Sequence, residues 1–169
     1  MTPPVERAPL AEDPAPHTAA ELAAVLGLLP GPGRGDSTAL LSIGHSRDDA
    51  SRAAARAVAE AWRRRGGTVL AVVDWPESAA SWLRAAGRLT VPTPDAWAFA
   101  AAPVGFAQLA RRLGECATWD PARAVAFASL GQPSLPALAG ADILHGLRGA
   151  TSAGGIWQVH HGWVRSTRC

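Results

Sequence analysis

The chain has 169 residues, the usual length of a single domain, and carries 16 basic and 14 acidic side chains for a net charge of +2. So small an excess argues against nucleic acid as a partner, because proteins that neutralise many phosphates carry a larger basic surplus. Ala, Gly, Pro and Arg are abundant while Lys, Tyr and Asn are absent, a bias typical of a bacterium with a GC-rich genome.

Local sequence argues against membrane and secreted proteins. No apolar run long enough to span a membrane is free of charges, Pro or Gly. Residues 1–20 are acidic and Pro-rich, with neither a basic nor an apolar segment, so we expect no secretory signal. The two cysteines, Cys116 and Cys169, are too few for a disulfide framework. These features predict a cytoplasmic protein without a membrane span.

Three segments are predicted along the chain. Residues 1–17 are expected to form a disordered Pro-rich arm, because they cannot bury enough apolar area to offset the entropy of ordering. Residues 18–36 should contain a helix followed by a Gly- and Pro-rich linker, and Thr18 with Glu21 forms a capping-box pattern at the helix start. Residues 37–169 are predicted to form a single α/β domain.

Within this domain, short apolar runs predict strands and amphipathic segments predict helices in alternation. In chain order we expect a strand at 38–43, a helix at 48–65, a strand at 69–73, a helix at 77–86, a strand at 95–102, a helix at 105–113, a strand at 124–129 and a helical turn or two at 134–139. The strand-like segment 154–164 forms a hairpin or a kinked edge strand if the chain turns at His161-Gly162.

Strands that alternate with helices favour right-handed crossovers and a parallel sheet covered on both faces. The predicted fold class is therefore α/β, with a three-layer, doubly wound and mostly parallel sheet of four to five strands. The strand order is expected to be flavodoxin-like, 2-1-3-4 followed by the C-terminal segment at the edge. Ligands of such sheets bind outside the carboxyl ends of the strands.

Polar and aromatic side chains follow three of the predicted strands at this edge. The candidate ligand-binding residues are His45, Ser46, Arg47, Asp74, Trp75 and Ser129. Ser46, Arg47 and backbone N–H groups at a helix start can hold an anion, and the indole of Trp75 can cover an apolar or cationic ligand. Structural roles are the alternatives: Ser46 caps the helix, Asp74 pairs with an arginine, and Trp75 packs in the core.

Catalytic, cofactor and metal motifs are missing. The chain has no phosphate-binding loop, no dinucleotide fingerprint and no Gly-x-Ser-x-Gly, so we assign no cofactor and no catalytic residue. It also lacks Cys-x-x-Cys and His-x-x-x-His. His160 and His161 are adjacent in a predicted strand, where neighbouring side chains point to opposite faces, so we expect no metal site there.

The order of the elements and several short sequence segments indicate a resemblance to a known family. These segments are Arg-Arg-Gly-Gly-Thr-Val at 64–69, Ser-Trp-Leu at 81–83, Pro-Asp-Ala-Trp-Ala-Phe at 94–99, and the sequences of residues 105–113 and 144–150. Over residues 38–151 the chain resembles one lobe of the type I periplasmic ligand-binding proteins, the branched-chain amino-acid receptor family. The resemblance implies a non-catalytic module that binds or senses an amino-acid-like or carboxylate ligand.

Those receptors are exported and hold their ligand between two lobes, whereas this chain has the length of one. We therefore expect a second copy or a protein partner to complete the cleft, or the chain to be a regulatory derivative or relic of a receptor. One alternative is an accessory protein of a biosynthetic or regulatory operon. Another is a tetrapyrrole metal chelatase, because Gly44-His45-Ser46-Arg47 resembles the turn after the first strand of those enzymes; His145 is the next histidine that could act with it.

Overall fold

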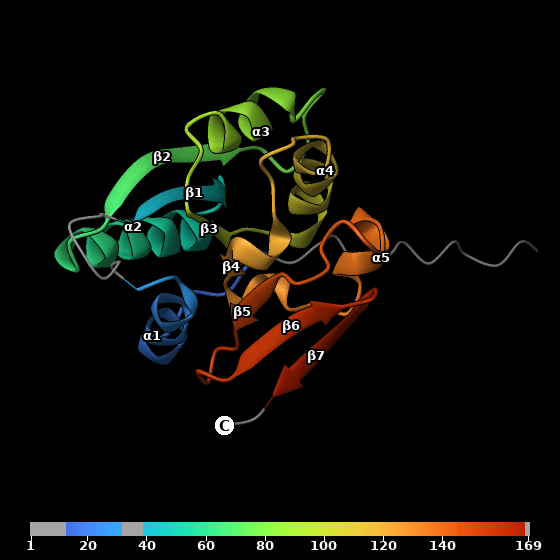
Figure 1. Ribbon diagram of the computed structural model, residues 1–169. Helices are drawn as coiled ribbons and strands as arrows, with labels where there is room; N and C mark the ends of the chain where they lie inside the picture. Colours follow the sequence, from blue (N-terminus) through green and yellow to red (C-terminus); the bar gives the residue numbers. More distant parts are fainter. Residues whose placement is uncertain (1–12, 32–38, 168–169) are drawn as a thin grey trace, which may run out of the picture.

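The computed structural model describes residues 13–31 and 39–167 (Figure 1). Seven strands form one sheet in the order β2-β1-β3-β4-β5-β6-β7. Their bounds are β1 (Leu40–Ser46), β2 (Thr68–Trp75), β3 (Ala96–Ala100), β4 (Ala124–Ala126), β5 (Arg148–Ala150), β6 (Ile156–His160) and β7 (Trp163–Thr167). The pairs among β1 to β5 are parallel, and β6 and β7 pair antiparallel with their neighbours.

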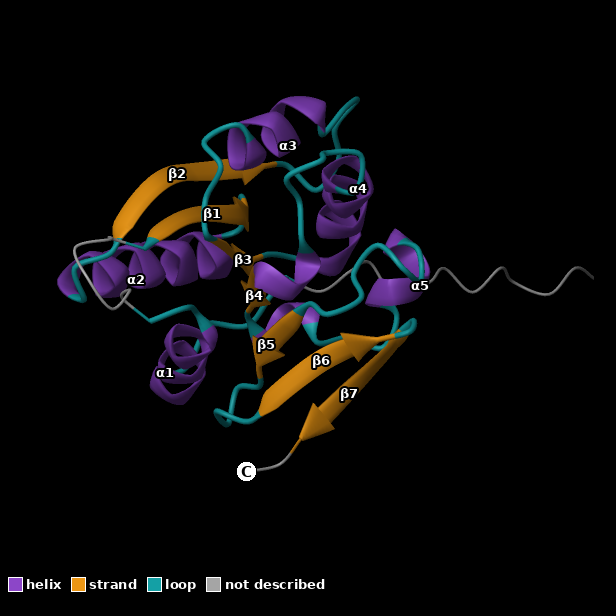
Figure 2. Ribbon diagram, viewed as in Figure 1, coloured by secondary structure: helices purple, strands orange, loops and turns teal. Residues whose placement is uncertain are grey.

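Helices cover both faces of the sheet, which gives three layers (Figure 2). The helices are α1 (Ala19–Leu28), α2 (Asp49–Arg64), α3 (Leu83–Thr90), α4 (Pro103–Leu113) and α5 (Leu135–Ala139), with 3-10 turns at Pro121–Arg123 and Ala128–Leu130. One buried cluster joins α1 and α2 to the sheet, and a second joins α3, α4 and α5 to its other face. The predicted three-layer, mostly parallel α/β fold is confirmed.

The helices α1 and α2 lie where they were predicted because their ends are encoded locally. Thr18 caps α1, and its hydroxyl accepts the Glu21 N–H while the Glu21 carboxylate accepts the Thr18 N–H, as a capping box requires. Asp48 caps α2 by accepting the Ser51 N–H at 2.8 Å. Two arginines in the last turn of α2 complement its dipole, and Trp62 anchors its buried face.

The predicted strand number is too low, because seven strands are present instead of four or five. β1, β2, β3 and β4 follow the predicted order 2-1-3-4, but β5 was missed between β4 and the C-terminal segment. β5 has three residues with Gly149 at its centre, and glycine is disfavoured in strands. It is required here because a Cβ on Gly149 would overlap the Trp157 ring and the Ala126 carbonyl oxygen.

Two other elements also differ from the prediction. β2 lies at the edge of the sheet and is mostly half-buried or exposed, although its apolar run is typical of a buried strand. The helix expected at 77–86 begins only at Leu83, whose side chain is 61% exposed. The chain before it stays irregular because the Glu77 carboxylate accepts the Gly105 N–H and the Ser81 hydroxyl accepts the Leu83 N–H.

The C-terminal segment forms a hairpin of β6 and β7 with its turn at His161-Gly162, one of the two predicted forms. Both turn residues have positive φ, 43° and 80°, as a type I′ hairpin turn requires. The predicted linker lies largely outside the described residues, as does the predicted arm up to residue 12. Within the described ranges, no helix is long and apolar enough to cross a membrane.

Candidate functional site

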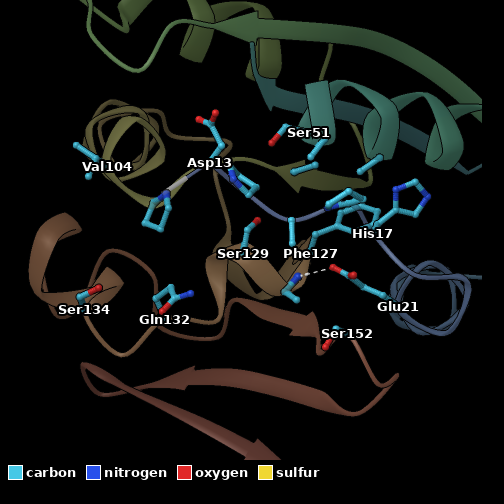
Figure 3. A pocket seen from close by; sticks show the side chains of 18 of the residues that line it. Asp13, His17, Glu21, Ser51, Val104, Phe127, Ser129, Gln132, Ser134 and Ser152 are labelled. Atoms are coloured by element: carbon cyan, nitrogen blue, oxygen red, sulfur yellow. Dashed lines mark hydrogen bonds between the residues drawn. The ribbon is translucent and has the colours of Figure 1, made fainter. Parts of the chain in front are cut away.

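A cavity of about 810 Å³ lies at the carboxyl edge of the sheet. Its lining includes Ala100, the last residue of β3, together with Ser51 from the first turn of α2 and Val104 from the first turn of α4. Phe127 and Ser129, which follow β4, form another wall (Figure 3). The parallel strands all have their carboxyl ends at this edge, so the sheet brings together segments that are far apart in the sequence.

The cavity borders the topological switch point of the sheet and extends toward the segments that follow β4 and β5. After β1 the chain passes through α2 to β2, and after β3 it passes through α4 to β4 on the other side. Because α2 and α4 lie on opposite faces, their first turns separate and leave a crevice between β1 and β3. This is where open α/β sheets bind their ligands.

The segment 13–17, which we expected to belong to a disordered arm, lies along this cavity in Figure 3. His17 packs edge-on against Phe127 with 5.7 Å between the ring centroids, and Asp13 lines the cavity with an exposed carboxylate. The two prolines between them, Pro14 and Pro16, restrict the backbone to extended conformations. The segment therefore supplies a wall that the sequence pattern did not predict.

Glu21 fixes the wall opposite α4. It is only 4% exposed, and its carboxylate accepts the Ala128 N–H at 2.7 Å (Figure 3). It also accepts the Thr18 N–H at 3.3 Å. A buried carboxylate is stable only when such donors replace its lost hydration. Glu21 thus joins the start of α1 to the 3-10 turn that carries Ser129.

The remaining lining combines apolar side chains with hydroxyl and amide groups. The polar members that sequence reasoning missed are Asp13, His17, Glu21, Ser51, Gln132, Ser134 and Ser152. They come from segments far apart in the chain, and none belongs to a recognisable ligand-binding motif. Among the described residues that line the cavity, no arginine is present.

Ser46 is fully buried and binds the chain itself rather than facing the cavity. Its hydroxyl donates to Asp48 at 2.5 Å and accepts the Ala102 N–H at 3.0 Å, so it joins β1 to the starts of α2 and α4. Burial of Asp48 opposes its ionisation, but hydrogen bonds from Ser46 and Ser51 outweigh this and lower its pKa. The negative charge of Asp48 therefore already satisfies the N-terminus of α2.

The N-terminus of α4 is satisfied in the same way. Its N-cap, Ala102, has no capping side chain, but Glu77 reaches across from the loop after β2 and accepts the Gly105 N–H at 2.9 Å. Burial raises the pKa of Glu77, the Gly105 hydrogen bond opposes this, and the negative charges of Asp48 and Asp13 raise it further. Both helix starts at the crevice thus carry a carboxylate of the chain.

Replacing Glu77 by glutamine is expected to stabilise the protein at pH 7. Because the pKa of Glu77 is raised on folding, the native state holds the proton more tightly than the unfolded chain, and ionisation costs stability as the pH rises above about 4.5. The amide oxygen of glutamine still accepts the Gly105 N–H. The gain should be below about 1 kcal/mol because water screens the partly exposed carboxylate.

Urea denaturation at pH 7 and pH 4 measures this, with Glu115→Gln as the control at an exposed position. The gain should be present at pH 7 and absent at pH 4. A variant less stable than the wild type at pH 7 would show that the charged hydrogen bond to α4 outweighs burial and repulsion.

The six predicted ligand residues do not come together in one place. Ser129 lines the cavity, whereas His45 and Asp74 line a second pocket of about 340 Å³ between α2 and β2. Arg47 and Asp74 form an ion pair at 3.2 Å on the surface, with both side chains about half exposed. A ligand-binding role for the predicted residues, Ser46 and Arg47 among them, stays a prediction.

Trp75 is a core residue rather than a platform beside the crevice. Its side chain is 2% exposed and packs on Phe99 with 6.4 Å between the ring centroids. The two rings leave no room beside Gly44, where a Cβ would come within 2.9 Å of both. β2 alternates between exposed and buried positions at its end, and Trp75 takes a buried one.

Solved structures resemble this arrangement of strands and helices. One is described provisionally as a branched-chain amino acid ABC transporter from Rhodospirillum rubrum; it has a TM-score of 0.61 and 18% identity over 76% of this chain and 35% of that one. The predicted resemblance is confirmed at the level of the fold. A protein of Silicibacter pomeroyi described in the same terms has a TM-score of 0.61, with 13% identity over 76% of this chain and 33% of its own.

A protein of Rhodopseudomonas palustris has a TM-score of 0.59 and 14% identity over 68% of this chain and 31% of its own. This chain thus spans about a third of the length of the structures that it resembles. It matches no model of a known protein family and no functionally curated protein. At identities this low the likeness concerns the fold, and ligands must be argued from the cavity.

Proposed function

We propose that the chain binds a small organic molecule in the cavity at the carboxyl edge of its sheet and does not transform it chemically. The position of the cavity at the topological switch point is the observation that carries this proposal. Its volume of about 810 Å³ lies within the range of small-molecule sites, about 300–1,000 Å³. Its lining combines apolar side chains with polar groups that can orient a ligand, as in such sites.

The charges around the cavity favour an amine-bearing ligand over a bare carboxylate. Asp48 and Glu77 already satisfy the starts of α2 and α4, so a ligand anion there would meet like charges. Asp13 offers an exposed carboxylate on the wall, and Ser129 and Gln132 offer neutral hydrogen-bonding groups. An amino-acid-like ligand fits this set if its amine binds Asp13.

A second copy of the chain or a protein partner is proposed to cover the exposed side of this cavity. Asp13, Gln132 and Ser134 are exposed at its rim and would be in reach of such a partner. A cytoplasmic location stays a prediction. The chelatase alternative gains no support, because His145 lies beside His160 and His161 while the buried His45 contacts the Ser46 carbonyl.

Thermal unfolding against a panel of amino acids and of the matching carboxylates without the amine tests the proposal. A ligand at a hundred times its Kd stabilises the native state by about 2.7 kcal/mol, which raises the Tm of a chain this long by about 5–10 °C. We expect such a shift from amine-bearing compounds. Asp13→Asn should weaken their binding by about tenfold, and Ser129→Leu, which removes a hydroxyl and places a bulkier apolar side chain in the cavity, should abolish it.

The matched control is Ser166→Leu, the same change at an exposed position of β7. It should leave the ligand-induced shift unchanged. A flat response of the wild type across the panel would favour the accessory-protein alternative. A shift that survives Ser129→Leu would place the ligand elsewhere on the molecule.

A further inference from the structure

Three of the five histidines meet at one corner of the molecule, beside the turn of the C-terminal hairpin. His145 lies in the loop between α5 and β5, His160 ends β6, and His161 opens the turn to β7. The ring centroids are 5.2 Å apart for His145 and His160, 4.6 Å for His145 and His161, and 4.4 Å for His160 and His161. All three side chains are exposed.

The turn explains why two adjacent histidines share one side of the sheet, against the expectation that they point to opposite faces. Alternation holds only while the backbone stays extended, and His161 has left the strand with a φ of 43°. A two-residue turn of this kind most often carries Asn or Asp before glycine, and here histidine takes that place before Gly162. The left-handed backbone thus turns the ring of His161 back toward His160.

The third ring is held at the turn by a hydrogen bond across the chain. The His161 N–H donates to Nδ1 of His145 at 3.3 Å, so the Nδ1 lone pair of His145 points into the cluster. This bond is longer than the usual 2.9–3.0 Å, and a metal ion can therefore displace it at little cost. One ring nitrogen of each histidine lies within 4.8 Å of the other two.

We propose that His145, His160 and His161 form a binding site for a divalent transition-metal ion of the zinc, nickel or copper type. Imidazole is a ligand that these ions prefer, whereas calcium and magnesium prefer oxygen. Metal–nitrogen bonds of about 2.0–2.1 Å in a tetrahedron place nitrogens about 3.3 Å apart, which small rotations of the exposed rings can reach. Three protein ligands leave one position for water or a ligand.

Imidazole binds a metal ion in its neutral form, and no other group is needed to complete the three-histidine set. The bound ion would tie the loop before β5 to the hairpin turn, and it would stabilise the folded chain in proportion to its concentration.

Titration calorimetry with Zn²⁺ on the full chain tests the site. Cys116 and Cys169 are first replaced by serine in every sample, so that thiolates do not compete for the ion. We expect one ion per chain. His145→Ala and His160→Ala should each weaken binding by about tenfold or more. Loss of a residue that only hydrogen-bonds to a metal ligand lowers metal affinity by about 10–100-fold, and loss of the ligand itself should cost at least as much.

His17→Ala is the matched control, a histidine outside the cluster, and it should bind Zn²⁺ as the parent does. Because the three ligands are exposed, their alanine variants should fold, which circular dichroism verifies. Co²⁺ gives an independent readout, since its visible absorption should indicate nitrogen ligands and weaken in the same variants. Absence of binding in the parent, or unchanged affinity in His145→Ala and His160→Ala, would overturn the proposal.

Discussion

Replacing Gly149 by alanine is expected to lower the free energy of unfolding by about 3 kcal/mol. Gly149 lies in the middle of β5, where it pairs with Trp157 of β6 on one side and Ala126 of β4 on the other. A Cβ there would overlap the Trp157 ring and the Ala126 carbonyl oxygen. The ring cannot move aside, since it is 2% exposed and donates to the Ala150 carbonyl at 3.0 Å.

Urea and thermal denaturation measure the loss, which corresponds to about 6–12 °C in Tm. The matched control is Gly87→Ala in α3, where nothing lies within 4 Å of the new Cβ. It should stabilise the protein by about 0.5–1 kcal/mol, because alanine is the better helix former. Trp157→Ala should reduce the cost of Gly149→Ala only in part, since the backbone overlap at Ala126 remains. An unchanged stability in Gly149→Ala would contradict the observed packing of β5.

Replacing Glu21 by alanine is expected to cost about 2 kcal/mol of stability. The carboxylate accepts two backbone N–H groups, those of Thr18 and Ala128, and both lose a charged acceptor in the variant. One of them belongs to the capping box of α1, so the helix start is weakened together with the cavity wall. Urea denaturation at pH 7 measures the difference.

Glu21→Gln separates the two hydrogen bonds. The two N–H groups donate to different oxygens of the carboxylate, and glutamine replaces one of these oxygens by an NH₂ group, so about half of the loss should return. Glu60→Ala in α2 is the control, because its carboxylate is 67% exposed and lies 3.9 Å from Arg64; it should cost less than about 0.5 kcal/mol. Equal losses in Glu21→Ala and Glu60→Ala would rule out the anchoring role of Glu21.

The parts of the fold that are encoded locally could be predicted from the sequence. The caps and apolar face of α2 lie within one stretch of the chain, and so does the capping box of α1. β5 could not be predicted, because glycine at 149 is required by contacts with Trp157 of β6 and the Ala126 carbonyl of β4, both distant in the chain. The displaced start of α3 has a similar cause, since Glu77 is held out of the helix by Gly105 on α4.

The candidate site was predicted less completely than the fold. The large cavity lies at the carboxyl edge of the sheet, where ligands were expected to bind, but of the six predicted residues only Ser129 lines it. Most of its other polar groups lie on segments without periodicity, such as 13–17, whose place depends on contacts like that of His17 with Phe127. The histidine cluster was missed for another reason, because strand alternation was extended into a turn where His161 has positive φ.

The C-terminal hairpin has a consequence for any shortened form of the protein. Trp157 and Val159 of β6 are 2% and 0% exposed, and they belong to the same buried cluster as α3, α4 and α5. β7, by contrast, is exposed at most positions. A truncation that keeps β6 removes only an outer strand. A truncation that ends after β5 also removes Trp157, which packs on Gly149, and exposes the buried cluster to water.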